Sequence, residues 1–420
     1  MRSTFLFCLL LLMVSCTQKE NYSFTLMQGD GFLVNGPLSI DRTDIKFEHF
    51  ELLNDAKPIA YQIDSLANRV WFVHEAKNSV TYTIESKANS RSTSTQLSTI
   101  KKNGDLQLTV ANKPVLQYRY EMNIPPIAEI FERAGHPIPK TEVPLDSIFK
   151  KSGYLHPVMT PKGDTLTRIN PVDHLHHYGL WGPWTHTRID TTRVDFWNLG
   201  EGMGTVLFKE FNSITSGPTF SGFNAAQEHI DLKTQEKPQI ALNEDLVVQL
   251  WNLNRPDRYM FDYSTTFSSP LANGILFEAY RYGGGIGLRF NERWHKDNCE
   301  VLTSEGKNRS DADGTNARWC IVSGESSDGA GSNGILFMSH PENRMHPEPM
   351  RIWPVDGNGG RGDMFFEFCP IRHKEWKIEP NQDYQLNYRM VVFDGKLTAE
   401  EAEAYWQSYA KRPEIELSLN

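Results

Sequence analysis

The chain has 420 residues, of which 39 % are hydrophobic and 23 % charged, and its formal net charge is −9. This length can bury a large core in two to three domains. Nucleic-acid binding needs clustered lysine and arginine. The acidic chain has no such cluster, which excludes nucleic acid as a partner, whereas a few local arginines still allow an anionic substrate.

The first residues predict an export signal. Arg2 is followed by an apolar run over residues 5–14 and then by Cys16. The run is too short to cross a bilayer, so it predicts a signal peptide. Residues 13–16 resemble a relaxed bacterial lipobox. We therefore expect residues 1–16 to be a lipoprotein signal peptide, with Cys16 as the lipidated residue. We expect the protein to lie in the bacterial cell envelope, either in the periplasm or at the cell surface. The lipid would be its one contact with the membrane.

Short segments with alternating apolar side chains follow. Polar turns separate them, and they cover residues 61–66, 70–74, 80–84, 106–110 and 114–120. Period-two alternation at regular short spacing is typical of strands in a β-sandwich. We expect residues 17–120 to form an N-terminal β-sandwich portion.

A proline-containing excursion over residues 124–151 interrupts the strands, and a domain boundary is expected within it. Residues 127–134 predict a short helical turn. Strand-like segments then resume, and residues 150–412 are expected to form the main β-sandwich domain that carries the site. Residues 398–410 predict a helix with Thr398 as its cap. The predicted fold is all-β: a large antiparallel sandwich of the supersandwich kind, a smaller N-terminal β-sandwich portion and a short C-terminal helix.

Three cysteines remain after Cys8 and Cys16 are set aside, namely Cys299, Cys320 and Cys369. An odd, widely spaced set does not form a disulfide framework. Two alternatives stay open: a bridge between Cys299 and Cys320 in an oxidising periplasm, or three buried free thiols.

Histidine and tryptophan are concentrated between residues 153 and 210. Five of the thirteen histidines lie there, together with three tryptophans: His156, His174, His176, His177, His186, Trp181, Trp184 and Trp197. Imidazole titrates near neutral pH, and an indole face suits the C–H face of a sugar ring. In an extended backbone, His174 and His176 would point to one face and His177 to the other. This density predicts a functional site.

The histidine cluster has three interpretations. A metal site with His174 and His176 would need a third ligand from His156, His186 or Asp195. A metal-free site would use one histidine as acid or base, with Asp173 or a backbone carbonyl fixing its tautomer. The third interpretation is a structural polar cluster. No cofactor is expected, and a metal remains the alternative.

Two further segments carry candidate side chains. Residues 280–285 with Arg289 form one, because arginine can clamp a carboxylate. Residues 340–351 form the other, because three prolines force an irregular loop of the kind that often carries function. Surface ion pairing and a structural loop are the respective alternatives.

Several separated motifs occur in a recognisable order. They are His156-Pro157, Pro171-x-Asp173-His174-x-His176-His177-x-Gly179-Leu180-Trp181, Asp195-Phe196-Trp197, Tyr282-Gly283-Gly284, His340-Pro341-x-Asn343 and His346-Pro347. From about residue 105 to 410 the sequence resembles the PmoA-like family. The resemblance implies a bacterial exported protein of the kind found among carbohydrate-degrading proteins.

The working hypothesis is an exported carbohydrate-active enzyme acting on oligosaccharides, specifically a carbon–oxygen lyase that performs β-elimination at a uronic acid unit. Arg289 or Arg351 would neutralise the carboxylate, one of the three clustered histidines would be the base, and Tyr178 or His346 would be the acid. The expected catalytic residues are His174, His176, His177, Tyr178 and His346. The expected substrate-binding residues are His156, Trp184, His186, Tyr282, Arg289, His340 and Arg351. The alternatives are a non-catalytic glycan-binding lipoprotein, which would stack sugars on Trp181, Trp184 and Trp197, and a metal-dependent hydrolase or oxygenase.

Overall fold

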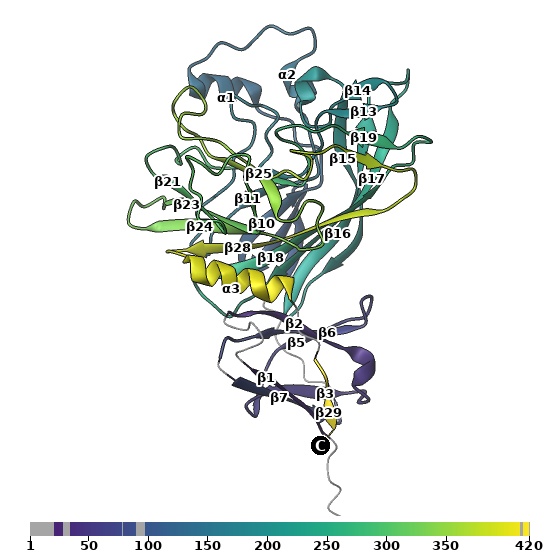
Figure 1. The fold of residues 1–420 in the computed structure, drawn as a ribbon, viewed down its shortest axis with the longest axis vertical. Helices are drawn as coiled ribbons and strands as arrows, with labels where there is room; N and C mark the ends of the chain where they lie inside the picture. Colours follow the sequence, from purple (N-terminus) through teal and green to yellow (C-terminus); the bar gives the residue numbers. More distant parts are fainter. Residues whose placement is uncertain (1–20, 28–33, 78, 90–96, 412–414, 420) are drawn as a thin grey trace, which may run out of the picture.

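The computed structural model describes residues 21–27, 34–77, 79–89, 97–411 and 415–419. Its named strands pair antiparallel and form a small domain and a large domain that lie end to end (Figure 1). The predicted all-β architecture with a short C-terminal helix is confirmed. The predicted leader and Cys16 lie outside the described residues. Among the described helices, none is long and apolar enough to cross a membrane.

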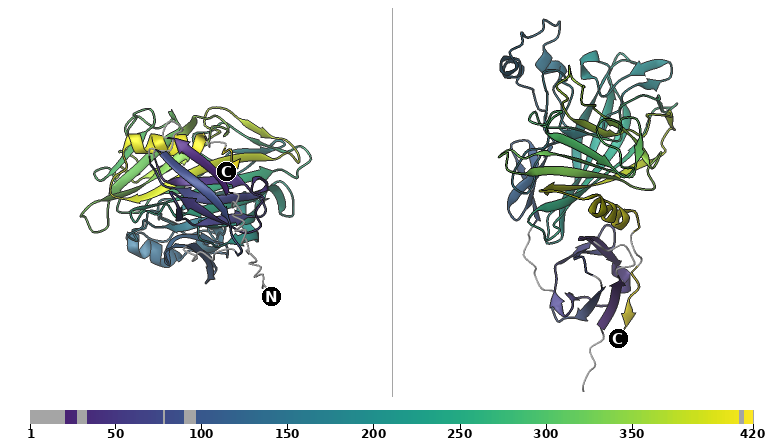
Figure 2. Two further views of the ribbon diagram at one scale, coloured as in Figure 1. Left: turned by 90° about the horizontal axis from the view of Figure 1, so that it is seen from below. Right: turned by 60° about the vertical axis from the view of Figure 1, so that its left-hand side comes forward.

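The small domain consists of two sheets, with strand orders β29-β1-β7-β3-β4 and β2-β6-β5. Their apolar faces enclose a core that includes Phe24, Phe72 and Tyr82, and the sheets curve around it in Figure 2. The strands are β1 (Asn21–Met27), β2 (Gly36–Asp41), β3 (Phe50–Asn54), β4 (Lys57–Pro58), β5 (Tyr61–Asp64), β6 (Arg69–His74), β7 (Ser79–Ser86) and β29 (Ser418–Leu419).

The domain boundary lies earlier than predicted. The next three strands, β8 (Leu97–Lys102), β9 (Asp105–Val110) and β10 (Lys113–Arg119), belong to the large domain. β10 pairs with β11 (Tyr154–Val158), for example Arg119 with Tyr154. The expected N-terminal portion over residues 17–120 is therefore corrected to end at β7. Alternation reveals a strand but not the strand it pairs with.

Two large sheets build the large domain. The long sheet has the order β15-β16-β17-β18-β28-β24-β23-β21, and the cavity sheet has the order β22-β25-β26-β20-β12-β11-β10-β9-β8. The long-sheet strands are β15 (Gly204–Thr215), β16 (Phe220–Asp231), β17 (Gln239–Trp251), β18 (Arg258–Ser268), β21 (Cys299–Thr303), β23 (Trp319–Glu325), β24 (Ser332–Ser339) and β28 (Tyr384–Asp394). The remaining cavity-sheet strands are β12 (Leu180–Trp181), β20 (Ile286–Arg289), β22 (Asn316–Ala317), β25 (Glu348–Ile352) and β26 (Phe365–Phe368). A side sheet, β14-β13-β19-β27, joins β13 (Thr187–Ile189), β14 (Thr192–Val194), β19 (Ile275–Phe277) and β27 (Trp376–Ile378).

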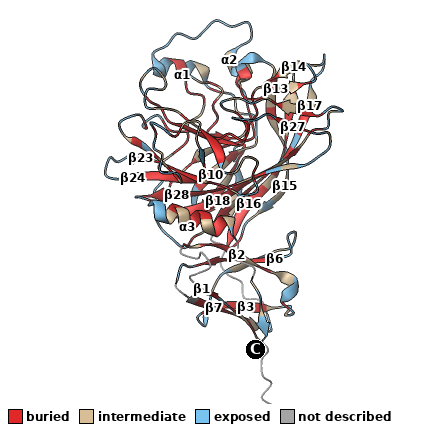
Figure 3. Ribbon diagram, viewed as in Figure 1, coloured by how far each residue is buried: buried red, intermediate tan, exposed pale blue. Residues whose placement is uncertain are grey.

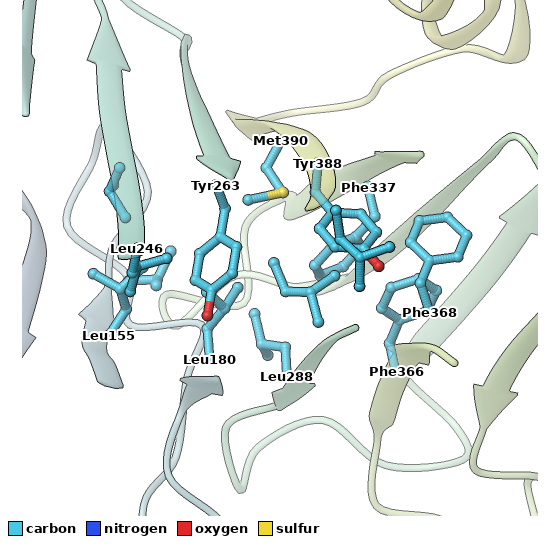
Figure 4. Packing of buried hydrophobic residues seen from close by; sticks show 14 of the residues in the cluster. Leu155, Leu180, Leu246, Tyr263, Leu288, Phe337, Phe366, Phe368, Tyr388 and Met390 are labelled. Carbon is cyan, nitrogen blue, oxygen red and sulfur yellow. The ribbon is translucent and has the colours of Figure 1, made fainter. Parts of the chain in front are cut away.

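The core of the large domain fills the space between the long sheet and the cavity sheet. Leu180 and Leu288 of the cavity sheet lie near Tyr263 and Met390 of the long sheet (Figure 4). All four side chains are buried. Removing apolar surface from water stabilises such packing by roughly 25 cal/mol per Å².

Helices are few in this fold. They are α1 (Ile127–Ala134), α2 (Leu145–Ile148), α3 (Ala399–Ala410) and the 3₁₀ turns η2 (Arg42–Asp44) and η3 (Leu199–Glu201). The predicted helices over residues 127–134 and 398–410 are confirmed, and Thr398 forms a capping box with Glu401. α3 covers the long sheet beside the small domain, whose Trp71 packs on Trp251 at 5.2 Å between ring centroids (Figure 1). The excursion that carries α1 and α2 is largely exposed (Figure 3).

The cysteines of the large domain are not bridged. Cys299, Cys320 and Cys369 are buried and free. β21 and β23 pair Cys299 with Gly324 but Cys320 with Thr303, so the two thiols stand at opposite ends of the ladder. The disulfide alternative is therefore wrong, and the free-thiol alternative is confirmed.

Candidate functional site

The large domain contains a cavity of about 330 Å³ that is lined by several of the predicted site residues. The described residues that line it include three histidines, four aromatic rings and two arginines, but no carboxylate. They are His174, His176, His177, Trp197, Asn198, Arg281, Tyr282, Arg351, Trp353, Pro354, Gly357, Asn358 and Phe365.

The three histidines lie on consecutive turns and not on a strand. The backbone N–H of His174 donates to the carbonyl of Pro171 at 2.9 Å, and that of His177 donates to the carbonyl of His174 at 3.0 Å. Asn170 opens this segment with a φ of 44°, a conformation that asparagine tolerates. The expected extended backbone is therefore wrong. The turns bring the three rings to centroid distances of 4.7–5.4 Å, so His176 and His177 line the same cavity as His174.

Asp173 orients His174 and fixes which ring nitrogen faces it. Its Oδ2 lies 2.7 Å from Nδ1 of His174 and 3.1 Å from Nη2 of Arg289. Burial opposes ionisation of Asp173, but the His174 hydrogen bond and the Arg289 charge outweigh it and hold the pKa of this carboxyl well below its usual range. An ionised carboxylate only accepts hydrogen bonds, so Nδ1 of His174 carries the proton. In the neutral imidazole of this tautomer, Nε2 carries the lone pair and is the nitrogen that can act as a base.

The other two histidines are neutral at physiological pH. Burial is the largest cause for both: it lowers the pKa of His176 to about 4 and that of His177 well below its ordinary value. The ring of His177 stacks on Phe365 at 5.2 Å, and its Nδ1 is buried with no hydrogen-bond partner in the part of the chain that the structure describes. These two rings act as cavity wall, and His174 is the group suited to proton transfer.

Tyr282 also lines the cavity and retains its proton. Burial raises the pKa of Tyr282 to about 12. Its hydroxyl accepts a hydrogen bond from Nδ2 of Asn198 at 3.4 Å, and the same Nδ2 lies 3.0 Å from Oδ2 of Asp195. Asp195 is fully buried and also accepts from Oγ1 of Thr185 at 2.7 Å. This network holds Asn198 and Tyr282 at the cavity.

Two arginines make the cavity electropositive. The Arg281 guanidinium lies 5.8 Å from the Tyr282 ring centroid and forms no ion pair with any residue that the structure describes. Nη1 of Arg351 lies 2.8 Å from Asp313, which also pairs with Arg372 at 3.0 and 3.1 Å. One carboxylate shared by two guanidiniums leaves a net positive charge beside the cavity.

Two predicted site residues are packing residues instead. Tyr178 is 1 % exposed, and its hydroxyl donates to the carbonyl of Phe149 at 2.6 Å, so it cannot serve as the acid. Trp184 is 3 % exposed and stacks on Phe277 at 4.1 Å, so it offers no face to a sugar. Gly284, at a φ of +77°, lies directly against the Trp184 ring and leaves no room for a Cβ.

Two other predicted binding residues do not line the cavity. His156 bonds through Nδ1 to Oγ1 of Thr167 at 2.9 Å, and burial lowers its pKa to about 3. His186 stacks on Tyr280 at 3.6 Å between centroids. Both assignments are corrected to structural positions, because their rings are occupied by protein partners.

The loop after β24 does not meet the histidine turns. The His346 ring lies parallel to Trp406 of α3 at 5.8 Å, and its Nδ1 is 3.1 Å from Oγ of Ser339. His340 packs against Tyr409 of the same helix. The predicted roles of His346 as acid and His340 as binding residue are therefore corrected. Within this segment, Arg351 is the residue that reaches the cavity.

A known family accounts for most of the chain. The model of a family of unknown function, DUF6807, matches residues 105–407. The chain belongs to this family. The matched range runs from the start of β9 into α3, so the DUF6807 region includes every residue of the cavity. No curated protein matches this DUF6807 chain.

Two solved structures resemble parts of this DUF6807 protein. Heparan sulfate lyase from Pedobacter heparinus aligns with a TM-score of 0.31 and 8 % identity, over 74 % of this chain and 38 % of the lyase. This chain thus spans less than two fifths of the length of that lyase. A galactose mutarotase related enzyme from Lactobacillus acidophilus aligns with a TM-score of 0.32 and 10 % identity, over 72 % of this chain and 100 % of the enzyme. The PmoA-like resemblance stays a prediction.

Sequence reasoning missed several residues of the DUF6807 cavity, among them Trp353, Phe365 and Asn198. Trp353 lies two residues after Arg351. Because residues two apart on a strand point to the same face, period-two alternation predicts that Trp353 shares the face of Arg351. Arg289, predicted as a ligand-binding residue, is instead fully buried behind Trp353, 4.5 Å from its ring centroid, where it pairs with Asp173. Among the described residues, no group of three or more histidine, cysteine, aspartate or glutamate side chains is arranged to hold a metal ion.

Proposed function

We propose that this protein is a carbohydrate-active enzyme that catalyses β-elimination at a uronic acid unit. The observation that carries the proposal is one cavity that combines His174, held by Asp173, with aromatic walls and two arginines. Aromatic faces suit the C–H faces of sugar rings. Guanidinium groups suit a carboxylate.

In the proposed reaction, Arg281 and Arg351 bind the uronate carboxylate and stabilise the negative charge that develops next to it. Nε2 of His174 removes the proton from C5. The electron pair of the C5–H bond forms a C4=C5 double bond, and the C4–O bond breaks. The Tyr282 hydroxyl donates its proton to the leaving oxygen, which departs as an alcohol or as water. Tyr282 thus takes the role first expected of Tyr178 or His346.

Elimination fits this cavity better than glycoside hydrolysis does. Hydrolysis ordinarily uses two carboxyl groups that face the scissile bond, and the described cavity lining contains none. Pairing Asp173 with Glu348 is not feasible. Glu348 is fully buried and accepts hydrogen bonds from Ser339, Asn343 and Tyr388.

The test is to incubate the protein with uronate-containing oligosaccharides and to follow the ultraviolet absorbance and mass of the unsaturated product. His174→Ala should abolish product formation and retain binding, whereas His136→Ala, at an exposed histidine, should behave as wild type. Absence of product across the panel would contradict the proposal. Binding without product in the wild-type protein would instead identify a glycan-binding protein.

We also propose that the protein is exported and anchored to the bacterial cell envelope through a lipid on Cys16, on the strength of the N-terminal sequence. Mass spectrometry of the N-terminal peptide should find diacylglycerol on this cysteine. Cys16→Ser should release the protein from the membrane fraction. An unlipidated wild-type protein would contradict this assignment.

A further inference from the structure

A second cavity of about 200 Å³ is lined in part by the residues that directly precede the histidine turns of the first. One side of it is α1, through Ile130 and Arg133, and the other side is residues 167–172 with Asn291 and Glu292. Val172 lines this second cavity and His174 lines the first, so Asp173 alone separates them along the chain.

The wall of the second cavity mixes charged, polar and apolar groups. Arg133 is exposed and forms no ion pair with the described part of the chain. Arg168 lies 2.9 Å from Glu292, whose side chain is 58 % exposed. Such an exposed pair contributes little stability and leaves both groups available to a ligand. Ile130 and Val172 supply an apolar side, and this combination is typical of sites that bind small polar molecules.

Two amides of this wall have unmet hydrogen bonds. Oδ1 of Asn170 and Nδ2 of Asn291 are buried and lack a hydrogen-bond partner among the described residues, so these two lining residues carry one unsatisfied acceptor and one unsatisfied donor. A sugar hydroxyl can satisfy either kind of group once the amide turns toward the cavity.

The two cavities share structural support. Asn170 lines the second cavity, while its Nδ2 donates to the carbonyl of Leu175 at 2.5 Å and its backbone N–H donates to the carbonyl of His177 at 2.8 Å. The residue that shapes one cavity therefore also closes the turns that place the histidines in the other. A ligand that occupies both would cross Asp173, whose side chain is 21 % exposed.

We propose that the second cavity binds the neighbouring sugar unit of the same substrate, so that the enzyme acts on oligosaccharides of at least two units in preference to monosaccharides. This inference rests on the proposed function. It also gives the excursion over residues 124–151 a role, because α1 forms one wall of the second cavity. Arg133 and Arg168 would bind the carboxylate or the hydroxyl groups of this neighbouring sugar unit.

The test measures binding without turnover, in the His174→Ala background of the full chain. The ligands are galacturonic, glucuronic and mannuronic acid with their di- and trisaccharides, titrated calorimetrically. The preferred trisaccharide should bind at least tenfold more tightly than its monosaccharide. Arg133→Ala should remove most of that difference, by about tenfold, and leave the monosaccharide affinity unchanged. Lys140→Ala, an exposed residue of the same excursion outside the cavity, is the matched control.

Each other outcome is decisive. Equal affinity for mono- and trisaccharides would overturn the second subsite and leave the elimination proposal standing, as would a trisaccharide preference that survives Arg133→Ala. Arg133 is exposed, so loss of folding would not confuse this result. If no uronate binds and the wild-type protein forms no unsaturated product, both proposals fail.

Discussion

Asp173 and His174 are consecutive in the chain, yet their side chains are joined by a hydrogen bond of 2.7 Å. Consecutive side chains on a strand point to opposite faces, so this contact requires the turn that Pro171 and Asn170 begin. Arg289 approaches the same carboxylate oxygen from within the protein, at 3.1 Å. The turn thus places a histidine of fixed tautomer at the cavity, supported from behind by a buried cation.

Asp173→Asn should lower kcat and leave KM largely unchanged. An asparagine amide can donate to Nδ1 and favour the tautomer that removes the lone pair from Nε2. We expect a loss of about 10² to 10⁴ in kcat, the usual contribution of general acid–base catalysis. Steady-state kinetics measures it, with Asp297→Asn at an exposed carboxylate as the control. A change confined to KM would show that Asp173 contacts substrate and does not position the base.

Arg281→Ala should raise KM for a uronate substrate. Its guanidinium has no carboxylate partner among the described residues, so its charge is available to the ligand, and a charge-assisted hydrogen bond is worth about tenfold or more in affinity. For the methyl ester of the same substrate, Arg281→Ala should raise KM much less. Arg351→Ala should have the smaller effect on KM, because Asp313 already shares its charge. Equal losses for the acid and the ester would contradict carboxylate recognition by Arg281.

Glu348→Gln should stabilise the protein above neutral pH. Burial raises the pKa of Glu348 to about 7, above an ordinary value of 4.5. The folded state therefore binds more protons than the unfolded state between these values, and stability is lost as the pH rises from 4.5 to 7. The loss is about 3 kcal/mol by linkage. Urea unfolding of both proteins from pH 4 to 8 should show a difference that grows across this window and then levels off. A constant difference would refute the raised pKa.

His177→Phe should raise thermal stability while the cavity keeps its shape. Nδ1 of His177 is buried and has no hydrogen-bond partner among the described residues, a state that costs about 1–3 kcal/mol. Phenylalanine can keep the stack on Phe365. The pKa of His177 is depressed by burial, so the wild-type protein loses stability as the pH falls below about 6.5. The advantage of the variant should therefore grow at acid pH. Calorimetric melting of the large domain at pH 7 and 5 measures it, and a lower Tm would indicate an unseen partner for Nδ1.

The sequence alone located several of the strands and two of the helices, because period-two and period-3.6 patterns are local. β6, β9 and α3 lie where alternation and the Thr398 cap predicted them. The density of histidine and tryptophan also marked the segment that carries the site. The sequence predicts His174, Tyr282 and Arg351 as site residues, and all three line one cavity.

Tertiary structure alone decided which of the marked side chains reach that cavity. Trp184 and Tyr178 are buried in the core, and His346 packs against α3. The strands β8 to β10 belong to the large domain. Each of these outcomes depends on a partner distant in the chain, such as Phe277 for Trp184, Trp406 for His346 and β11 for β10. A local pattern shows that a side chain is apolar or titratable. Long-range packing determines whether a ligand or the protein itself covers it.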